Sequence, residues 1–439
     1  MTDVRSGSKL DGWFRLSERG SSVRTELLAG LSMFFASAYA VVVIPGMLAK
    51  AGVPHAAATT GTILTIVLAT AAVGFFANMP FVLAPGLGGT ALVAATLVQQ
   101  QHVPYPVAMG MVFWSGVAIL VLSLLGLRGL LAKVIPQNIR VAIGTAIGLF
   151  IVYIGFKLSG MLEPGKSGLE IGDLSSPEPL LALGGIVLVA ALQARKVPGA
   201  FVIGIVVLTL IGIPLGVTEL PDHWFQAPAG VGPVAFHIDL WSALRPEYLQ
   251  YLFAFFASEL FSATGVVLAV TERIGLTERE GQKSNINRTF LVDSVAITGG
   301  SMFGAPSVTT YAESAAGSDA GGRTGLTSLT TAGLFLVLLL FTPFATMIPS
   351  AATAPVLVVV GLSMMRGFKK VDMTDLTEAI PAGLLVACTI FWGNFGNGIA
   401  AALTAYVLIK VVAGKFRDVH LGMWIMLPFL VFFFITSAH

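Results

Sequence analysis

Residues 51–127 read AGVPHAAATTGTILTIVLATAAVGFFANMPFVLAPGLGGTALVAATLVQQQHVPYPVAMGMVFWSGVAILVLSLLGL and contain no Asp, Glu, Lys or Arg. Two more charge-free runs separate Arg323 from Arg366 and Glu378 from Lys410. A helix that spans a membrane needs about 20 apolar residues. These runs therefore predict several membrane spans, and they decide the class of fold.

The composition of the whole chain agrees with a membrane protein. Of its 439 residues, 55% are hydrophobic and 11% are charged, whereas a soluble domain carries about 25% charged residues. The formal net charge of +2 gives no large attraction to nucleic acid. The single cysteine, Cys388, excludes a disulfide framework and a cysteine metal cluster. No cleavable signal is expected, because the first apolar run, Leu27 to Leu48, is too long for a signal core.

We predict an all-α polytopic protein with about fourteen transmembrane segments. The predicted spans are residues 27–49, 57–77, 83–101, 105–127, 135–156, 179–194, 198–215, 248–271, 289–304, 306–318, 324–347, 353–365, 379–393 and 396–413, and the run 421–436 either spans or lies flat. The predicted divisions are 1–24, a cytoplasmic segment; 25–215, a first repeat; 216–247, a polar connection; 248–418, a second repeat; and 419–439, an apolar C-terminal segment.

The positions of the basic residues predict the orientation. With the N-terminus in the cytoplasm, the span map assigns 21 of the 25 Lys and Arg residues to cytoplasmic segments. Cytoplasmic loops of membrane proteins carry an excess of Lys and Arg. We therefore expect a multi-pass protein of the plasma (inner) membrane with a cytoplasmic N-terminus.

A faint internal repeat relates the two halves. The string at 34–37, Phe-Phe-Ala-Ser, recurs at 255–258, and Ala84-Pro85 recurs as Ala305-Pro306, both at an offset of 221 residues. Seven predicted spans separate the matches, and an odd number inverts the second half relative to the first. The pattern predicts the inverted repeat of many secondary transporters.

Two segments at corresponding positions are interrupted by proline and glycine. Residues 77–90, ANMPFVLAPGLGGT, have two prolines and three glycines, and residues 305–317, APSVTTYAESAAG, open with a proline followed by a β-branched run. We expect both to be broken elements, half extended and half helical, whose free backbone N–H groups point at a substrate. Paired interruptions of this kind indicate a binding site near the membrane midplane.

Two carboxylates fall within this hydrophobic framework. Glu259 lies in the middle of the eighth span, and Glu313 lies in the second broken element. An ionisable residue inside a membrane is costly and normally faces a cavity or a partner, so we predict that both line the site. Asp293 is instead interpreted as a cap or ion pair at the start of the ninth span, near Arg288.

Motifs for other chemistry are missing from the sequence. No HExxH, P-loop or nucleophile elbow is present, which argues against an ATP-driven pump and an intramembrane hydrolase. We predict no catalytic residue, no metal site and no cofactor. A membrane sensor or scaffold would need no broken elements, and the sequence has no soluble signalling domain.

From about Glu26 to Lys415 the chain resembles the nucleobase–cation symporter family, in the nucleobase–ascorbate transporter superfamily, and specifically its AzgA-like hypoxanthine/guanine permease branch. The resemblance rests on the strings LAGL at 28–31, ANMP at 77–80, APGLG at 84–88, ELF at 259–261, YAESAAG at 311–317 and GGRTGL at 321–326. It implies a seven-plus-seven inverted repeat with a core and a gate domain, homodimers, and proton-coupled uptake, with sodium as the other candidate ion.

The resemblance also assigns roles to residues. Glu259 matches the acidic residue of the eighth span and Glu313 the glutamate of the tenth, both of which contact the base in the family. The branch usually has Asn where this chain has Thr90, and a second Asp where it has Ser262. Xanthine, uracil, adenine or a different heterocycle therefore stay open beside hypoxanthine and guanine.

We therefore predict that Glu259, Glu313, Thr90, Ser262, Tyr311 and Gly89 contact the substrate, and that Glu259 also carries the coupled proton. Carboxylates accept hydrogen bonds from the N–H groups of a planar heterocycle, and Tyr39, Phe261 and Tyr311 are candidates to stack on it. A sulfate- or bicarbonate-like anion transporter of the same architecture is the alternative. Two buried carboxylates would repel such a substrate unless they were protonated.

Overall fold

The computed structural model describes residues 9–126, 136–165, 168–220, 227–275, 282–391, 395–424 and 427–428. Within these ranges, eight helices have the length and apolar composition to cross a membrane. Three shorter apolar helices, Ala200–Gly212, Leu376–Phe391 and Gly398–Val412, accompany them. The predicted all-α polytopic class is confirmed.

The first half of the chain and its connection to the second contain the following elements. They are α1 (Lys9–Phe14), α2 (Val23–Ser37), α3 (Ala40–Lys50), α4 (His55–Ala72), the π-helical turn η1 (Val73–Ala77), β1 (Leu83–Pro85), α5 (Leu87–Ala91), its π-helical continuation η2 (Leu92–Gln100), α6 (Tyr105–Leu124), α8 (Gln137–Leu158), the hairpin β2 (Leu162–Gly165) and β3 (Gly168–Ile171), α9 (Pro177–Ala194), α10 (Ala200–Gly212), η3 (Ser242–Leu244) and η4 (Pro246–Tyr248).

The second half is built from the same kinds of element. They are α11 (Leu249–Arg273), α12 (Gln282–Met302), β4 (Val308–Thr310), α13 (Ser314–Asp319), α14 (Gly325–Leu338), η5 (Leu339–Phe341), α15 (Thr342–Thr346), α16 (Ser350–Met364), η6 (Met365–Lys370), α17 (Leu376–Phe391), α18 (Phe395–Val412) and η7 (Phe416–Asp418).

Capping residues and prolines set the starts of many helices. The hydroxyl of Ser22 accepts a hydrogen bond from the Thr25 N–H at 3.2 Å at the start of α2. Proline directly precedes α4, α6 and α8 at Pro54, Pro104 and Pro136. At the start of a helix the backbone N–H has no partner within the helix, so proline, which has no N–H, is well tolerated there.

The packing of the helices repeats between the two halves. The contact between α4 and α14 corresponds to the contact between α12 and α6. The contact between α8 and α17 corresponds in the same way to the contact between α16 and α9. The contact between α10 and α16 corresponds to the contact between α18 and α8. Helices α8 and α16 also pack on each other. Equivalent elements thus make equivalent contacts, which is the signature of the predicted seven-plus-seven inverted repeat.

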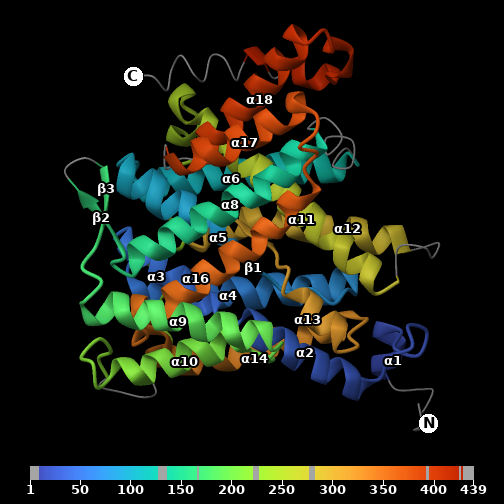
Figure 1. Cartoon of the computed structure of the whole chain (residues 1–439). Helices are drawn as coiled ribbons and strands as arrows, with labels where there is room; N and C mark the ends of the chain where they lie inside the picture. The colour runs from blue at the N-terminus through green and yellow to red at the C-terminus, as the bar shows by residue number, and fades with distance from the viewer. Residues whose placement is uncertain are drawn as a thin grey trace.

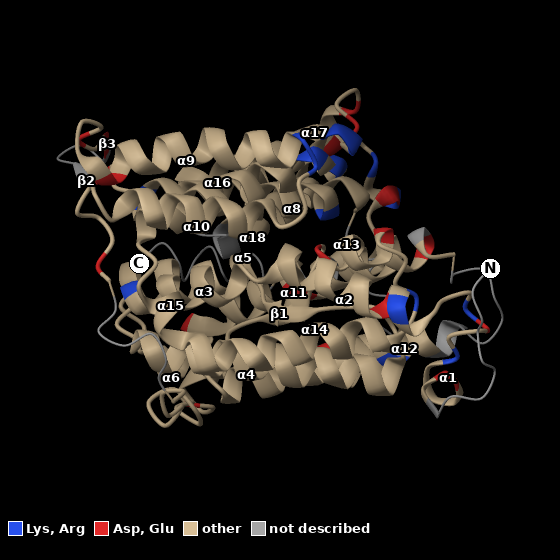
Figure 2. Cartoon of the chain, turned by 90° about the horizontal axis from the view of Figure 1, so that it is seen from below, with Lys and Arg blue, Asp and Glu red and all other residues tan. Residues whose placement is uncertain are grey.

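Two layers of helices enclose the broken elements. Figure 2 shows α8, α9, α10, α16 and α17 on one side and α4, α6, α12 and α14 on the other, with β1, α5, α11 and α13 between them. The first layer corresponds to the predicted gate domain and the second to the core domain. Strand β1 lies near the centre of the molecule (Figure 1).

Some predicted boundaries change. The first span is interrupted at Ala38 and Tyr39, which separate α2 from α3, and α12 begins at Gln282 rather than at residue 289. The run 421–436 lies mostly outside the described residues, so the total number of spans stays a prediction.

Candidate substrate-binding site

The two broken elements meet at the centre of the protein. Strands β1 and β4 pair antiparallel, with Ala84 opposite Thr309. The Gly86 N–H donates to the Ser307 carbonyl at 2.8 Å, which extends the pairing by one residue. The prediction that both elements are half extended and half helical is confirmed.

Glycines let the chain close around this junction. A Cβ atom on Gly89 would lie 2.1 Å from the side chain of Ser307, and one on Gly88 would lie 2.6 Å from Ile147 of α8. Both contacts are far inside the usual separation of carbon atoms. Ser307 itself has a left-handed backbone, with φ of 57°. The glycine-rich stretch therefore allows α5 to approach both the partner element and the opposite layer.

A cavity of about 170 Å³ lies beside the strands. Pockets for drug-sized ligands occupy about 300–1,000 Å³, so this cavity suits a smaller molecule. Both layers and both repeats contribute to its wall. The lining residues are Tyr39, Gly86, Leu87, Gly88, Gly89, Ile147, Ile151, Ser258, Glu259, Ser262, Val266, Ser307, Thr309, Thr310, Tyr311, Ala312, Glu313, Val360 and Met364.

The first turn of α5 contributes backbone donors to this wall. Leu87, Gly88 and Gly89 line the cavity, and they are the first three residues of α5. The amide groups of a first helical turn have no acceptor within their helix. Residues of this first turn therefore line the same cavity as the two carboxylates Glu259 and Glu313.

Glu313 is held in place by an aromatic partner. It lies directly before α13, and its Oε1 accepts a hydrogen bond of 2.7 Å from the hydroxyl of Tyr39. Tyr39 sits at the interruption between α2 and α3, and its ring stacks on Tyr311 with 6.4 Å between the centroids. The Tyr311 hydroxyl in turn donates to the Pro85 carbonyl of β1. This chain of contacts fixes the carboxylate relative to both broken elements.

Glu259 approaches the cavity from the middle of α11. Its side chain is 2% exposed, and its Oε2 accepts a hydrogen bond of 2.6 Å from Ser115 of α6. Ser262 lines the same cavity one turn further along α11. Ser115 was not predicted, since a single serine in an apolar span carries no signal of its own.

Asp293 has a different role from the predicted one. It lies in the interior of α12, so its interpretation as a cap at the start of the span is wrong. Its Oδ1 accepts hydrogen bonds from the backbone N–H of Thr310 at 3.0 Å and from the Thr310 hydroxyl at 3.1 Å. Asp293 therefore anchors β4 beside the cavity.

The structure brings most of the predicted contact residues together. Glu259, Ser262, Tyr311, Glu313 and Gly89 line the cavity. Thr90 is fully buried next to Gly89 and is not part of the wall, and its hydroxyl has no hydrogen-bond partner among the described residues. The side chain of Phe261, a predicted stacking residue, lies outside the described part of the chain.

Another buried carboxylate organises the end of the protein near the N-terminus. Glu26 is fully buried, and its oxygens accept from the N–H groups of Arg323, Thr324 and Thr327 at 3.0–3.2 Å. It thereby joins α2 to the start of α14. Within the described ranges, no three His, Cys, Asp or Glu residues form a group that could hold a metal ion.

Comparison with known proteins agrees with this geometry. Residues 24–401 match the family Xan_ur_permease, described as a permease family. The chain is 34% identical to the guanine/hypoxanthine permease GhxP of Escherichia coli O157:H7 over 98% of both chains. It is also 34% identical to the adenine permease AdeP of Escherichia coli K12, over 95% of this chain and 94% of that one.

A solved structure shares the fold. The transmembrane domain of the bicarbonate transporter BicA from a cyanobacterium superposes with a TM-score of 0.59 at 19% identity, covering 88% of this chain and 97% of that one. At this identity the likeness concerns the architecture alone. The family match and the two permeases lead to one conclusion: the chain belongs to the nucleobase–ascorbate transporter family, in its AzgA-like branch.

Proposed function

We propose that this permease takes up a nucleobase, a purine before others, by proton symport, with the substrate held by Glu259 and Glu313. The observation that carries the proposal is the small cavity at the strand junction, where a carboxylate from α11 and one from the start of α13 lie in the same wall. Each comes from the second repeat, and the first repeat contributes the amide donors of α5.

The wall has the groups that a nucleobase requires. Ring and exocyclic N–H groups need acceptors, which the two carboxylates supply, and carbonyl oxygens or bare ring nitrogens need donors, which the α5 amides supply. Tyr39 engages Oε1 of Glu313, which leaves Oε2 as the acceptor for a ligand. The rings of Tyr39 and Tyr311 lie at the same wall and suit a flat heterocycle.

The choice of base is proposed to depend on small differences near the cavity. One similar protein is named for guanine and hypoxanthine and another for adenine, at the same 34% identity. Ser262 lines the cavity, whereas Thr90 acts from behind Gly89. We propose that these two hydroxyls, where the branch usually has larger polar groups, tune the preference among purines.

Glu259 is our candidate for the proton-linked group. It is almost fully buried, and Ser115 is a neutral hydrogen-bond donor to it. Binding of a proton and of a base at adjacent positions links the two equilibria, and this linkage is reciprocal. Sodium is the rival coupling ion.

The distribution of charge supports an orientation with the N-terminus in the cytoplasm. Lys and Arg gather at the end of the molecule where α2 and α12 begin (Figure 2). We propose that this end faces the cytoplasm of a cell whose plasma membrane holds the protein. Assembly into a homodimer stays a prediction.

A panel of substrates tests the proposed function. Purified protein is heated with adenine, guanine, hypoxanthine, xanthine or uracil, and uptake of the labelled bases, of sulfate and of bicarbonate is measured in proteoliposomes. We expect at least one purine to raise the melting temperature and to be taken up. Uptake of an anion without uptake of any base would establish the anion transporter instead.

A further inference from the structure

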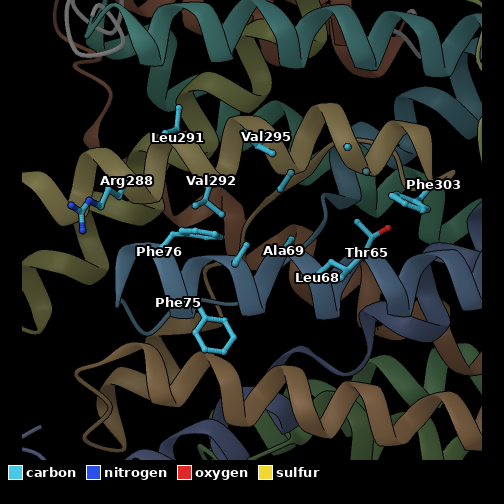
Figure 3. A pocket seen from close by; sticks show the side chains of 14 residues that line it. Thr65, Leu68, Ala69, Phe75, Phe76, Arg288, Leu291, Val292, Val295 and Phe303 are labelled. Carbon is cyan, nitrogen blue, oxygen red and sulfur yellow. The ribbon is translucent and has the colours of Figure 1, made fainter. Parts of the chain in front are cut away.

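A long groove separates α4 from α12 on the outer side of the core layer. Its volume is about 800 Å³, several times that of the cavity at the strand junction. It has no residue in common with that cavity. Figure 3 shows Arg288 at one end of the groove, Thr65 and Phe303 at the other, and Phe76 and Val292 between the two helices.

The shape of the groove follows from the sizes of its side chains. Its floor contains alanine and glycine, among them Ala69 and Gly299, and a Cβ on Gly299 would meet no atom within 4 Å. Its rim is built from large apolar side chains that are more than half exposed: Leu68 at 56%, Phe76 at 69% and Val295 at 52%. The side walls therefore stand above an open floor, as a chain-shaped apolar ligand requires.

Arg288 is the charged member of this apolar lining. Of the fourteen residues that line the groove, Thr65 and Arg288 have polar side chains. The Thr65 hydroxyl donates to the Gly61 carbonyl of its own helix at 2.8 Å, so it presents no donor to the groove. Arg288 is exposed, and among the described residues no carboxylate lies within ion-pair distance of its guanidinium. The groove thus combines one cation at its end with apolar walls along its length.

A tryptophan lies at the Arg288 end of the groove. The ring of Trp13 in α1 packs edge-on against Phe75, which lines this end, with 6.4 Å between the centroids. Tryptophan is enriched where membrane meets water. From Arg288 to its end at Met302, α12 advances by fourteen residues, or about 21 Å at 1.5 Å per residue. Since the hydrocarbon of one leaflet is about 15 Å thick, the groove is long enough for one acyl chain.

We propose that this groove binds an anionic phospholipid from the leaflet on the side of the N-terminus. One acyl chain lies along the floor between α4 and α12, and the phosphate and anionic headgroup lie against Arg288. A guanidinium suits a phosphate because its N–H groups form a planar fork that matches the oxygens. The site rests on charge complementarity at one end and on apolar shape along the rest, and it does not depend on which substrate is carried.

Two substitutions test the two halves of the site in the full-length protein. Arg288→Gln removes the cation, and Gly299→Leu adds a side chain to the floor at a position where an added Cβ would meet no atom within 4 Å. Arg366→Gln and Gly333→Leu are matched controls, because Arg366 is another exposed arginine and Gly333 is another helical glycine with no atom within 4 Å of an added Cβ. Native mass spectrometry counts phosphatidylglycerol and phosphatidylcholine molecules retained on each detergent-purified variant.

The wild-type protein and both controls should retain phosphatidylglycerol in preference to phosphatidylcholine. Arg288→Gln should lower the retention of phosphatidylglycerol about fivefold, the factor that one basic residue contributes near an anionic surface, and Gly299→Leu should lower the retention of both lipids.

Unchanged retention in both test variants would overturn the proposal. Three other results would overturn it as well. Loss of lipid in Gly299→Leu with no preference for phosphatidylglycerol in the wild type would leave no role for Arg288. If the retained mass were that of a fatty acid, the groove would bind a fatty acid and not a phospholipid. Dissociation of a dimer in Gly299→Leu, without loss of lipid, would make the groove an interface between two copies of the chain.

Discussion

Replacing Glu313 by glutamine tests the binding site at a single atom. The Tyr39 hydroxyl donates to Oε1 of Glu313 at 2.7 Å, so the carbonyl oxygen of the glutamine should keep that position. The amide nitrogen then replaces Oε2 and presents a donor where the substrate N–H requires an acceptor. An unsatisfied donor in a buried site costs about 1–3 kcal/mol, which corresponds to a loss of affinity of about 5- to 150-fold, since 1.4 kcal/mol is a factor of ten.

Isothermal titration of the preferred base into purified protein measures this loss. Glu219→Gln is the matched control, because Glu219 is an exposed glutamate beyond the end of α10 and away from the cavity. Tyr39→Phe should weaken binding less than Glu313→Gln, because the carboxylate acceptor remains while its positioning bond is lost. A folded Glu313→Gln protein that binds the base as tightly as the wild type would refute the assignment of Glu313 as a ligand.

Four further changes probe the rest of the account. Thr90→Asn combined with Ser262→Asp should move the substrate preference toward hypoxanthine or guanine in competition uptake, and an unchanged ranking would exclude these positions from selectivity. Thr90→Val should leave the melting temperature nearly unchanged, because the hydroxyl is buried without a hydrogen-bond partner among the described residues. It should change the ranking of purines in the same competition uptake, and a clear fall in melting temperature would mean that the hydroxyl stabilises the fold instead. Asp293→Ala should destabilise the protein by about 1–3 kcal/mol in thermal unfolding, because the Thr310 N–H loses its acceptor. Asp293→Asn keeps an acceptor oxygen and should therefore lose less stability in the same measurement. Lys410→Met should lower the free energy of unfolding by about 3–5 kcal/mol, because Lys410 forms a nearly buried ion pair of 2.9 Å with Glu378, which the substitution leaves without its cation. The double variant that also carries Glu378→Gln should regain most of that stability. No recovery in the double variant would mean that the two residues are not coupled.

The broken elements were predictable because their cause is local. Proline removes a backbone donor and glycine permits close approach, and both effects are visible at Pro85, Gly89 and Pro306 without any knowledge of tertiary structure. The two membrane carboxylates, Glu259 and Glu313, were predictable for a similar reason, since their burial is costly wherever the surrounding helices lie.

The partners of these residues were not predictable, because they come from distant elements. Tyr39 and Glu313 are 274 positions apart, and Ser115 and Glu259 are 144 apart. No local pattern relates such pairs. The role of Asp293 was missed because α12 begins with a polar turn at Gln282, where hydropathy gives no signal of helix, so the residue appeared to lie at a helix end.

The central claim, uptake of a base driven by protons through Glu259, is tested most directly in proteoliposomes with an imposed pH step. The account predicts that wild-type uptake of the preferred base rises with an inward proton gradient and collapses with a protonophore. It also predicts that Glu259→Gln loses this response more completely than it loses exchange of the base down its own gradient. Wild-type uptake that ignores the pH step and follows a sodium gradient would contradict it.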